Sequence, residues 1–372
     1  MRRALILAAL GLATFGAVAL AQTGNVVLQP GESVTVEAAP LPPSSTVTET
    51  TTVTTTVTPP STTTPPPPTC VGTLVAPGGG LKTAMDTAPA GTTFCLAAGT
   101  YSIPATITVK DGVAVQGAGR AQTFLVGTGA QNLFTAVSGA TWEFRSLDIS
   151  GAVGNPSVCG ADCGRAFVGN GDSLTVTDVR CHDNQNQCVG SGSADLHFVG
   201  NECDHNGNAA FAAATARSTS CIKRVRGGAS DITTEVRDSF IHDNIWVGVW
   251  FDFYEGVAIV ENNVITGNGK AGIQYEVSGG FNARDNAVFS NNTIQDNGLT
   301  GISTIGGGII CNTCADLLAD SNDFGGNFQH LAFKFINSTR EWGNIHGVIV
   351  RNNILNGDTV NCIAGVTCSG NA

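Results

Sequence analysis

A short phrase that recurs at a fixed spacing limits what this chain can fold into. Gly248–Asp252 is followed 24 residues later by a similar phrase at Gly272–Glu276, and a third copy runs over Gly308–Asn312. Each copy reaches an asparagine 14 residues after its first glycine, at Asn262, Asn286 and Asn322. A repeat of this length, made of short apolar runs and Gly/Asn turns, is typical of a solenoid in which every repeat forms one coil.

Alternation along the repeated phrase predicts two faces for each strand. Successive strand side chains point to opposite faces, so Phe251 suits the interior, whereas Trp250 and Asp252 point outward. Neighbouring coils lie about 4.8 Å apart. We therefore expect Asp252 to lie directly beside Glu276 on the outer wall, with Asn312 next in line.

Composition supports a β-rich chain and argues against some partners. The 372 residues include 47 glycines but few aromatic residues and no long helical pattern, which indicates short strands joined by many turns. Asp and Glu number 29 against 18 Lys and Arg, which gives a net charge of −11. Nucleic-acid binders carry a basic footprint, and anionic membranes attract basic segments, so we expect neither as a partner.

The first 69 residues are expected to lie outside the main domain. Arg2 and Arg3 precede an apolar run over 4–18 and a small-residue cleavage site at 19–21, which together predict a signal peptide over residues 1–21. Residues 22–39 contain short β-type runs, and residues 40–69 are rich in Pro and Thr, as in an extended linker. The main domain is expected over 70–372.

The predicted signal peptide indicates export. No second apolar run of about 20 residues follows it, so we expect no membrane insertion after cleavage. The expected location is secreted, extracellular or in the cell envelope. An uncleaved membrane anchor is the alternative interpretation of the first residues.

Twelve cysteines in an exported chain predict a set of disulfides. The coil register stacks Cys181 on Cys203 and Cys188 on Cys221, so we expect the bonds Cys181–Cys203 and Cys188–Cys221. The other cysteines are expected to pair with near neighbours: Cys70 with Cys95, Cys159 with Cys163, Cys311 with Cys314, and Cys362 with Cys368. Metal binding by Cys311 and Cys314 is the alternative, although a single CxxC is weak evidence for zinc.

The start of the main domain resembles a known superfamily. Residues 90–101, AGTTFCLAAGTY, and residues 111–119, DGVAVQGAG, resemble the opening of secreted right-handed parallel β-helix proteins of the pectate-lyase-like superfamily. The resemblance implies an all-β fold, and the period implies about ten coils. The superfamily includes lyases, hydrolases, epimerases and non-catalytic proteins. Residues Leu81–Asp86 follow three glycines with an amphipathic pattern, and we expect a helix there that caps the first coil.

The outer wall near Asp252 holds the candidate catalytic residues. Lys223 belongs one coil earlier, in the column of Trp250 and Gln274, diagonally across from Asp252. Two stacked carboxylates repel when both are ionised, unless they share a proton, a cation or a lysine. We expect Asp252, Glu276 and Lys223 to be the catalytic residues.

Four further residues are expected to bind a polysaccharide substrate: Trp250, Trp246, Gln274 and Lys334. The tryptophans would stack on a sugar ring. A lyase or epimerase needs a base and a group that neutralises the uronate, whereas a retaining hydrolase needs carboxylates about 5–5.5 Å apart. Two alternatives remain for the wall. Asp252, Glu276 and Asn312 would hold a structural Ca²⁺, or the carboxylates are solvated surface groups balanced by Lys223.

Other polar positions are interpreted as structural. Stacked asparagines predict a ladder of amide hydrogen bonds at the turns of Asn184, Asn206, Asn244, Asn268 and Asn297. His182, His205 and His242 recur just before these turns, and we interpret them as turn residues, with a metal-binding column as the alternative. Alternation would turn Arg224 inward, so we expect its strand to end at Lys223.

The function predicted from these features is the binding and modification of an extracellular polysaccharide by a monomeric lyase or glycoside hydrolase. Ca²⁺ is the one cofactor considered. A non-catalytic cell-surface or adhesion module that binds glycan is the alternative.

Overall fold

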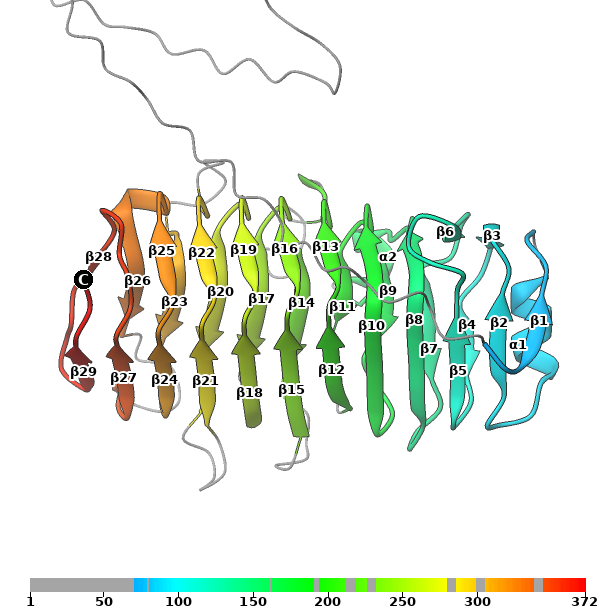
Figure 1. The fold of residues 1–372 in the computed structure, drawn as a ribbon, viewed down its shortest axis with the longest axis horizontal. Coiled ribbons are helices and arrows are strands. Elements are labelled where there is room, and N and C mark those ends of the chain that lie inside the picture. The colour runs from blue at the N-terminus through cyan, green and yellow to red at the C-terminus, as the bar shows by residue number, and fades with distance from the viewer. Residues whose placement is uncertain are drawn as a thin grey trace, which may run out of the picture. The chain divides into compact units, whose positions relative to one another are not determined.

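The computed structural model describes residues 70–78, 80–160, 162–190, 194–209, 211, 219–225, 232–279, 286–298, 305–337 and 344–372. The expected signal peptide, N-terminal β segment and linker lie outside these residues. Within them the chain winds into coils that are stacked along one long axis (Figure 1). Each strand runs across this axis and lies beside the equivalent strands of the neighbouring coils. The predicted all-β solenoid is therefore confirmed.

One wall of the solenoid is a parallel sheet of ten strands in the described part of the chain, called sheet B here, which agrees with the expected number of coils. Its strands are β4 (Ile107–Val109), β7 (Asn132–Ala136), β9 (Arg165–Val168), β11 (Gln187–Gly190), β14 (Ser220–Val225), β17 (Val247–Asp252), β20 (Ala271–Glu276), β23 (Gly307–Asn312), β26 (Leu331–Ile336) and β28 (Thr359–Val360).

The rest of each coil belongs to a second parallel sheet, called sheet A, whose strands form two rows that share the long strands β8 (Thr141–Ser150) and β10 (Ser173–His182). The first row also contains β1 (Thr73–Val75), β2 (Thr93–Leu96), β5 (Val113–Gln116), β12 (Asp195–Val199), β15 (Ile232–Arg237), β18 (Gly256–Glu261), β21 (Ala287–Ser290), β24 (Leu317–Asp320), β27 (Val348–Arg351) and β29 (Val366–Ser369). The second row contains β3 (Gly99–Ile103), β6 (Thr123–Gly127), β13 (Glu202–Asp204), β16 (Phe240–His242), β19 (Val264–Thr266), β22 (Thr293–Gln295) and β25 (Asp323–Gly325).

The core lies inside the coils and follows the predicted alternation. Phe251 and Tyr275 are register partners on β17 and β20, both fully buried, with ring centroids 5.9 Å apart. Phe289 from sheet A stacks on Phe251 at 5.9 Å. Burial of an aromatic side chain of this size contributes roughly 1.5–3 kcal/mol.

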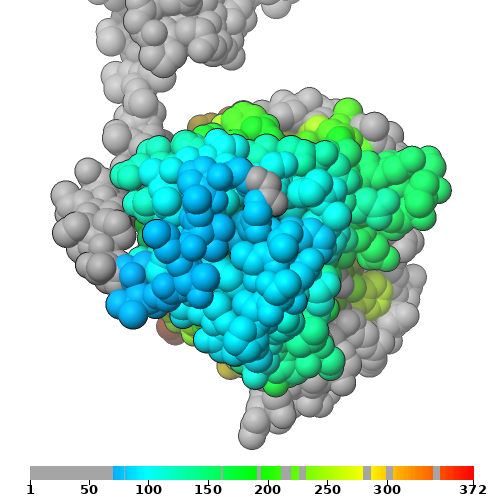
Figure 2. Space-filling model, turned by 90° about the vertical axis from the view of Figure 1, so that its right-hand side faces the viewer, coloured from blue at the N-terminus to red at the C-terminus, as the bar shows by residue number. Residues whose placement is uncertain are grey.

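The helix expected after the three glycines is present as α1 (Leu81–Thr87). It packs against β3 and β4, and Leu81 and Met85 are buried in the core. Figure 2 looks onto this N-terminal end of the solenoid. Among the short helices of the described chain are also α2 (Pro156–Cys159) and η1 (Phe328–His330). Among the described residues, no helix is long and apolar enough to cross a membrane.

Buried asparagines join the coils at two corners. At the corner before sheet B, Asn184, Asn206, Asn244, Asn268, Asn297 and Asn327 each donate Nδ2 to the next side chain, and the series ends on Asp358. This is the predicted ladder. A second series, not predicted, joins the two rows of sheet A through Asn263, Asn292, Asn322, Asn353 and Asn371. The amides replace water as partners for backbone groups at turns where no sheet partner exists.

All twelve cysteines are paired, and four of the expected disulfides are present: Cys70–Cys95, Cys159–Cys163, Cys311–Cys314 and Cys362–Cys368. The disulfide at Cys311 and Cys314 excludes their alternative role as metal ligands, because a metal needs thiolates. The expected bonds Cys181–Cys203 and Cys188–Cys221 are wrong. The actual bonds are Cys181–Cys188 and Cys203–Cys221, each within one coil.

The wrong pairing has a geometric cause. Cys181 and Cys203 are register partners, as predicted, but stacked side chains have parallel Cα–Cβ vectors, which a disulfide cannot join easily. Cys188 faces Cys181 across the coil, with the Cα atoms 5.8 Å apart. In a later coil the position equivalent to Cys188 is Gly248, where a Cβ would approach the Ile265 methyl group to 3.0 Å. Ile265 belongs to the coil after Gly248, and the positions equivalent to Cys181 and Cys188 in the Gly248 coil hold Ile241 and Gly248. The disulfides therefore occupy positions that a later coil fills with isoleucine and glycine.

The cross-coil pairing is testable by mapping peptides without reduction. We expect fragments that link Cys181 to Cys188 and Cys203 to Cys221, because only facing cysteines direct their Cβ atoms toward each other. A fragment that links Cys181 to Cys203 would contradict the arrangement of the coil corner.

Removal of one ladder asparagine should destabilise the whole solenoid. Asn268 is 1% exposed, and its amide bonds to Asn297 and to the carbonyls of Ile241 and Thr266. Asn268→Ala should lower the free energy of unfolding by about 3 kcal/mol, since each buried partner left unpaired costs roughly 1–3 kcal/mol. Denaturant unfolding measures the change. Asn262→Gly is the control, because Asn262 is exposed with φ of 58° and should change stability by less than about 1 kcal/mol.

Candidate functional site

The outer face of sheet B carries the predicted site residues in the predicted register. Lys223, Trp250, Gln274, Ile310 and Lys334 are successive partners in one column. A second column runs through Asp252, Glu276 and Asn312. The carboxylates therefore lie side by side on neighbouring strands, where the 24-residue offset puts them. Strands β14, β17, β20 and β23 position these side chains, and the face they form is called the sheet B wall below.

Lys223 lies at the centre of the sheet B wall. Its Nζ is 3.0 Å from Asp252 Oδ2 and 3.4 Å from the centroid of the Trp250 ring. The residue is 5% exposed, and burial lowers the pKa of its ammonium group, while the charge of Asp252 acts in the opposite direction. The diagonal contact between Lys223 and Asp252 agrees with the predicted geometry.

Glu276 accepts hydrogen bonds from two amide groups. Gln274 Nε2 donates to Oε2 at 2.5 Å, and Asn312 Nδ2 donates to Oε1 at 2.9 Å. Asp252, in turn, is paired with Lys223. These carboxylates have N–H partners of their own, and Asn312 presents its NH₂ group rather than its oxygen to Glu276. The described groups therefore do not fit a Ca²⁺ ion, which needs six to eight converging oxygen atoms.

Lys270 is a site residue that sequence reasoning missed. It lies in the turn before β20, and its Nζ is 5.2 Å from the Trp246 ring centroid and 5.6 Å from that of Trp250. Burial lowers the pKa of Lys270 to about 8; Glu276 opposes this effect and the charge of Lys223 adds to it. The sequence feature that indicates Lys270 is its position one residue before a strand of the sheet B wall, because a long side chain at that position folds over the face of the strand.

The tryptophans do not form an open platform for a sugar. Trp250 is 4% exposed, and the Lys223 ammonium group occupies a face of its ring. Trp246 is half-buried in the turn before β17, beneath Lys270. Lys334 is half-buried and stands two strands from Gln274, so it does not join the group around Lys223.

The expectation that the strand ends at Lys223 is wrong. Strand β14 continues to Val225, and Arg224 points into the solenoid with no exposed surface. Its Nε donates to Thr234 Oγ1 at 3.1 Å, and its Nη2 donates to the Ala194 carbonyl. Burial lowers the pKa of Arg224. Alternation predicted the direction correctly, and internal acceptors make the buried cation tolerable.

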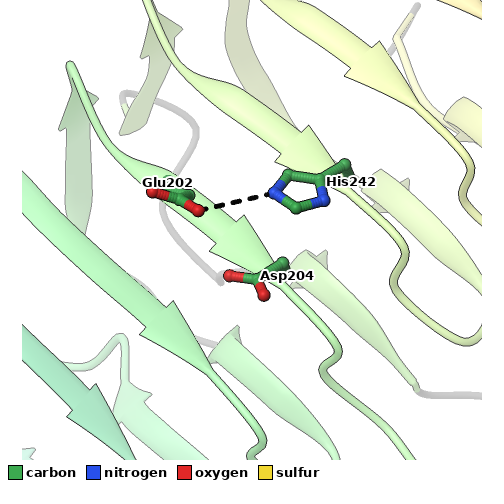
Figure 3. Close-up of side chains that lie close together, drawn as sticks. All are labelled: Glu202, Asp204 and His242. Atoms are coloured by element: carbon green, nitrogen blue, oxygen red, sulfur yellow. Dashed lines mark ion pairs between the residues drawn. The ribbon is translucent and has the colours of Figure 1, made fainter. Parts of the chain in front are cut away.

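A second polar group lies on the outer face of sheet A. Glu202, Asp204 and His242 each bring one potential ligand atom within 4.8 Å of the others (Figure 3). His242 Nε2 is 3.6 Å from Glu202 Oε1, and its Nδ1 is 2.8 Å from Asp243 Oδ2. Burial alone would lower the pKa of His242, but the bonds to Asp243 and Glu202 outweigh it and raise the pKa to about 9.

This second group has its own cations. Arg180 contacts Asp204 through Nη2 at 2.8 Å and Nε at 3.1 Å, and its Nε lies 3.4 Å from Glu202. His205 Nδ1 is 2.7 Å from Asp204, which has no exposed side-chain surface. A metal ion here would have to displace Arg180 and His205 from Asp204 and a proton from His242. The arrangement therefore favours an ion-pair lattice, consistent with the interpretation of these histidines as structural.

An open pocket of ≈ 430 Å³ lies beside this lattice. It is lined by residues at the corner before sheet B, where the asparagine ladder lies: Asp183, His205, Asn206, Gly207, Asp243, Asn244, Ile245 and Gly267. The pocket and the sheet B wall are separate candidate surfaces for a ligand.

The comparisons with known proteins bear on the fold. No protein-family model matches the sequence, and no curated protein matches it. Pectate lyase Pel9A is similar in structure, with 15% identity, a TM-score of 0.52, and coverage of 78% of this chain and 73% of that chain. An alginate lyase in complex with a trisaccharide shows 12% identity, a TM-score of 0.48, and coverage of 80% and 85%. The likeness to Pel9A confirms the right-handed parallel β-helix.

Burial of Lys270 predicts a pH-dependent stability. The pKa of Lys270 falls from 10.5 to about 8 on folding, so between these values the unfolded chain binds more protons and stability rises with pH. Lys270→Met should lack this rise and should be more stable than the wild type below pH 8. Denaturant unfolding across this pH range tests the difference. Lys82→Met, at an exposed helix position, should retain the rise.

Proposed function

We propose that the sheet B wall binds an acidic polysaccharide and cleaves it by β-elimination at a uronate residue. The observation that carries this proposal is the pair of lysines over one tryptophan, the buried Lys223 and the half-buried Lys270. In the described part of the chain Lys270 has no ion-pair partner, whereas Lys223 is held by Asp252. The two lysines therefore suit different tasks.

Positive charge on the wall suits a uronate carboxylate. The Arg165 side chain runs over Gly190, where a Cβ would lie 2.5 Å from Arg165 Nε, and Gly190 is the strand partner of Lys223. Arg165 is 5% exposed, and its Nη2 is paired with Asp162 Oδ1 at 3.1 Å. Buried cations interact strongly with an anion because little water screens them. In this proposal Lys223 neutralises the carboxylate and thereby makes the proton at C5 of the sugar more acidic.

Lys270 supplies the base. Its pKa of about 8 leaves a useful fraction of neutral amine near neutral pH. The amine takes the C5 proton, the electron pair forms a C4–C5 double bond, and the C4–O4 bond breaks. The departing O4 takes a proton from the ammonium group formed at Lys270, which restores the amine.

The environment of the carboxylates favours elimination over hydrolysis. A retaining hydrolase needs one carboxylate as nucleophile and another as acid. Asp252 is paired with Lys223, and both oxygens of Glu276 accept amide hydrogen bonds. In this proposal Asp252 and Glu276 orient Lys223 and Gln274, and no step passes through a metal ion.

The setting of the protein agrees with an extracellular substrate. Six disulfides and the predicted signal peptide over residues 1–21 support export. The structurally similar Pel9A is a pectate lyase, so a pectate-like polymer is the natural first substrate to test.

A panel of acidic and neutral polysaccharides tests the reaction class. We expect ultraviolet absorbance from unsaturated ends with an acidic polymer and none with a neutral one. Reducing ends without this absorbance would indicate a hydrolase instead. Binding without either product would favour the non-catalytic glycan-binding module.

The role of Lys270 predicts a specific pH profile. Wild-type kcat/KM should fall about tenfold for each pH unit below 8, since protonation removes the base. Lys270→Met should lower kcat at least about a hundred-fold at every pH while oligosaccharide binding persists. Lys82→Met, on the exposed face of α1, serves as the control and should match the wild type. Full activity in Lys270→Met would exclude Lys270 as the base.

A further inference from the structure

Three polar atoms on the sheet B wall are buried without a partner: Asn312 Oδ1 and two atoms in the column of Lys223. Trp250 Nε1 and Gln274 Oε1 make no hydrogen bond in the described structure, although their residues are only 4% and 2% exposed. Buried polar groups nearly always have partners, and an orphan in a native structure calls for an explanation, such as a water or a ligand. No described side chain around them lies in hydrogen-bonding geometry with either atom.

The orientation of the Gln274 amide is fixed by its neighbour. Its Nε2 donates to Glu276 Oε2 at 2.5 Å. A flipped amide would set its oxygen against a carboxylate oxygen, and two acceptors cannot bond to each other. Oε1 is therefore the free end of the amide, and it can only accept.

The two orphan atoms have complementary chemistry at neighbouring positions. Trp250 and Gln274 are register partners on β17 and β20, so their side chains stand next to each other on one face. The indole N–H only donates, and the amide oxygen only accepts. A hydroxyl group donates one hydrogen bond and accepts another, so one hydroxyl satisfies both atoms.

We infer that Trp250 and Gln274 form a hydroxyl-recognition subsite, which selects one ring hydroxyl of the sugar bound at the wall. The inference rests on the proposed function, because the sugar is the acidic residue whose carboxylate lies against Lys223. Binding requires the amino groups over Trp250 to turn toward that carboxylate, which the flexible lysine stem allows while Lys223 stays near Asp252. A site built to bond a hydroxyl rejects a ligand that lacks it, since its buried polar groups then stay unpaired. Trp250 thus acts through its N–H edge.

The test compares three variants on two forms of one substrate. Gln274→Met and Trp250→Phe each remove one orphan atom. Ile310→Met changes the next residue of the same column, which is 1% exposed and carries no polar group. The probes are oligosaccharides of polygalacturonate or alginate, whichever the wild type cleaves, and the same oligosaccharides with O-acetylated ring hydroxyls.

We expect that the losses of kcat/KM caused by the substitution and by acetylation of the substrate do not add. Gln274→Met and Trp250→Phe should each lower kcat/KM about tenfold on the free hydroxyl form, and Ile310→Met should change it less than about twofold. Acetylation of the substrate should lower the kcat/KM of the wild type by a similar factor. It should not lower the kcat/KM of Gln274→Met any further, because this variant has already lost the hydrogen bond to the hydroxyl group. The thermal midpoint of Gln274→Met without substrate is the structural readout and should stay within a few degrees of the wild type.

Two other outcomes separate the inference from the function on which it rests. If the wild type cleaves the oligosaccharides and Gln274→Met behaves like Ile310→Met, a water fills the subsite and the inference is wrong. If acetylation and the Gln274→Met change reduce kcat/KM additively, the hydroxyl bonds elsewhere and the inference is likewise overturned. If the wild type neither cleaves nor binds any acidic oligosaccharide, the proposed function fails and the subsite fails with it.

Discussion

Hydrogen bonds between stacked amides at the coil corners hold the rest of the structure in place. Each buried asparagine of the ladder takes the place of water for backbone groups that no strand can reach. Asn244, for example, donates to Asn268 and also to carbonyls of its own turn and of a neighbouring coil. Because the coils from Asn184 to Asp358 repeat this bond, one register is imposed on their strands in all three rows. A slip by one residue would turn the core outward and break both ladders.

The chemistry of the sheet B wall depends on that register. Lys223, Asp252 and Glu276 come from three coils, and only the fixed stacking brings the ammonium group to 3.0 Å from one carboxylate. Burial of charged groups destabilises a protein unless they are paired. A wall that keeps Lys270 half-buried and without an ion pair in the described chain therefore retains a destabilising group, which is common at functional sites.

The sequence period predicts the solenoid, the faces of its strands and the neighbours of Asp252, because these follow from a repeat and from alternation. Three features of the structure could not be predicted from the repeat and the alternation. Cysteine pairing depends on the direction of Cβ at the corner where Cys188 replaces a glycine. Lys270 reaches the wall from a turn, where alternation says nothing of side-chain direction. Arg224 is tolerated inside only because Thr234 and a carbonyl accept its hydrogen bonds. Each depends on contacts between segments that a one-dimensional pattern does not contain.

The most direct measurement is a crystal structure of the Lys270→Met variant with an acidic hexasaccharide, since this variant is expected to bind the substrate without cleaving it. The account predicts a sugar over β14, β17 and β20, with its carboxylate within hydrogen-bonding distance of Lys223 Nζ and its C5 facing position 270. A hexasaccharide that lies instead over Glu202, Asp204 and His242 on sheet A, with the sheet B wall empty, would contradict it.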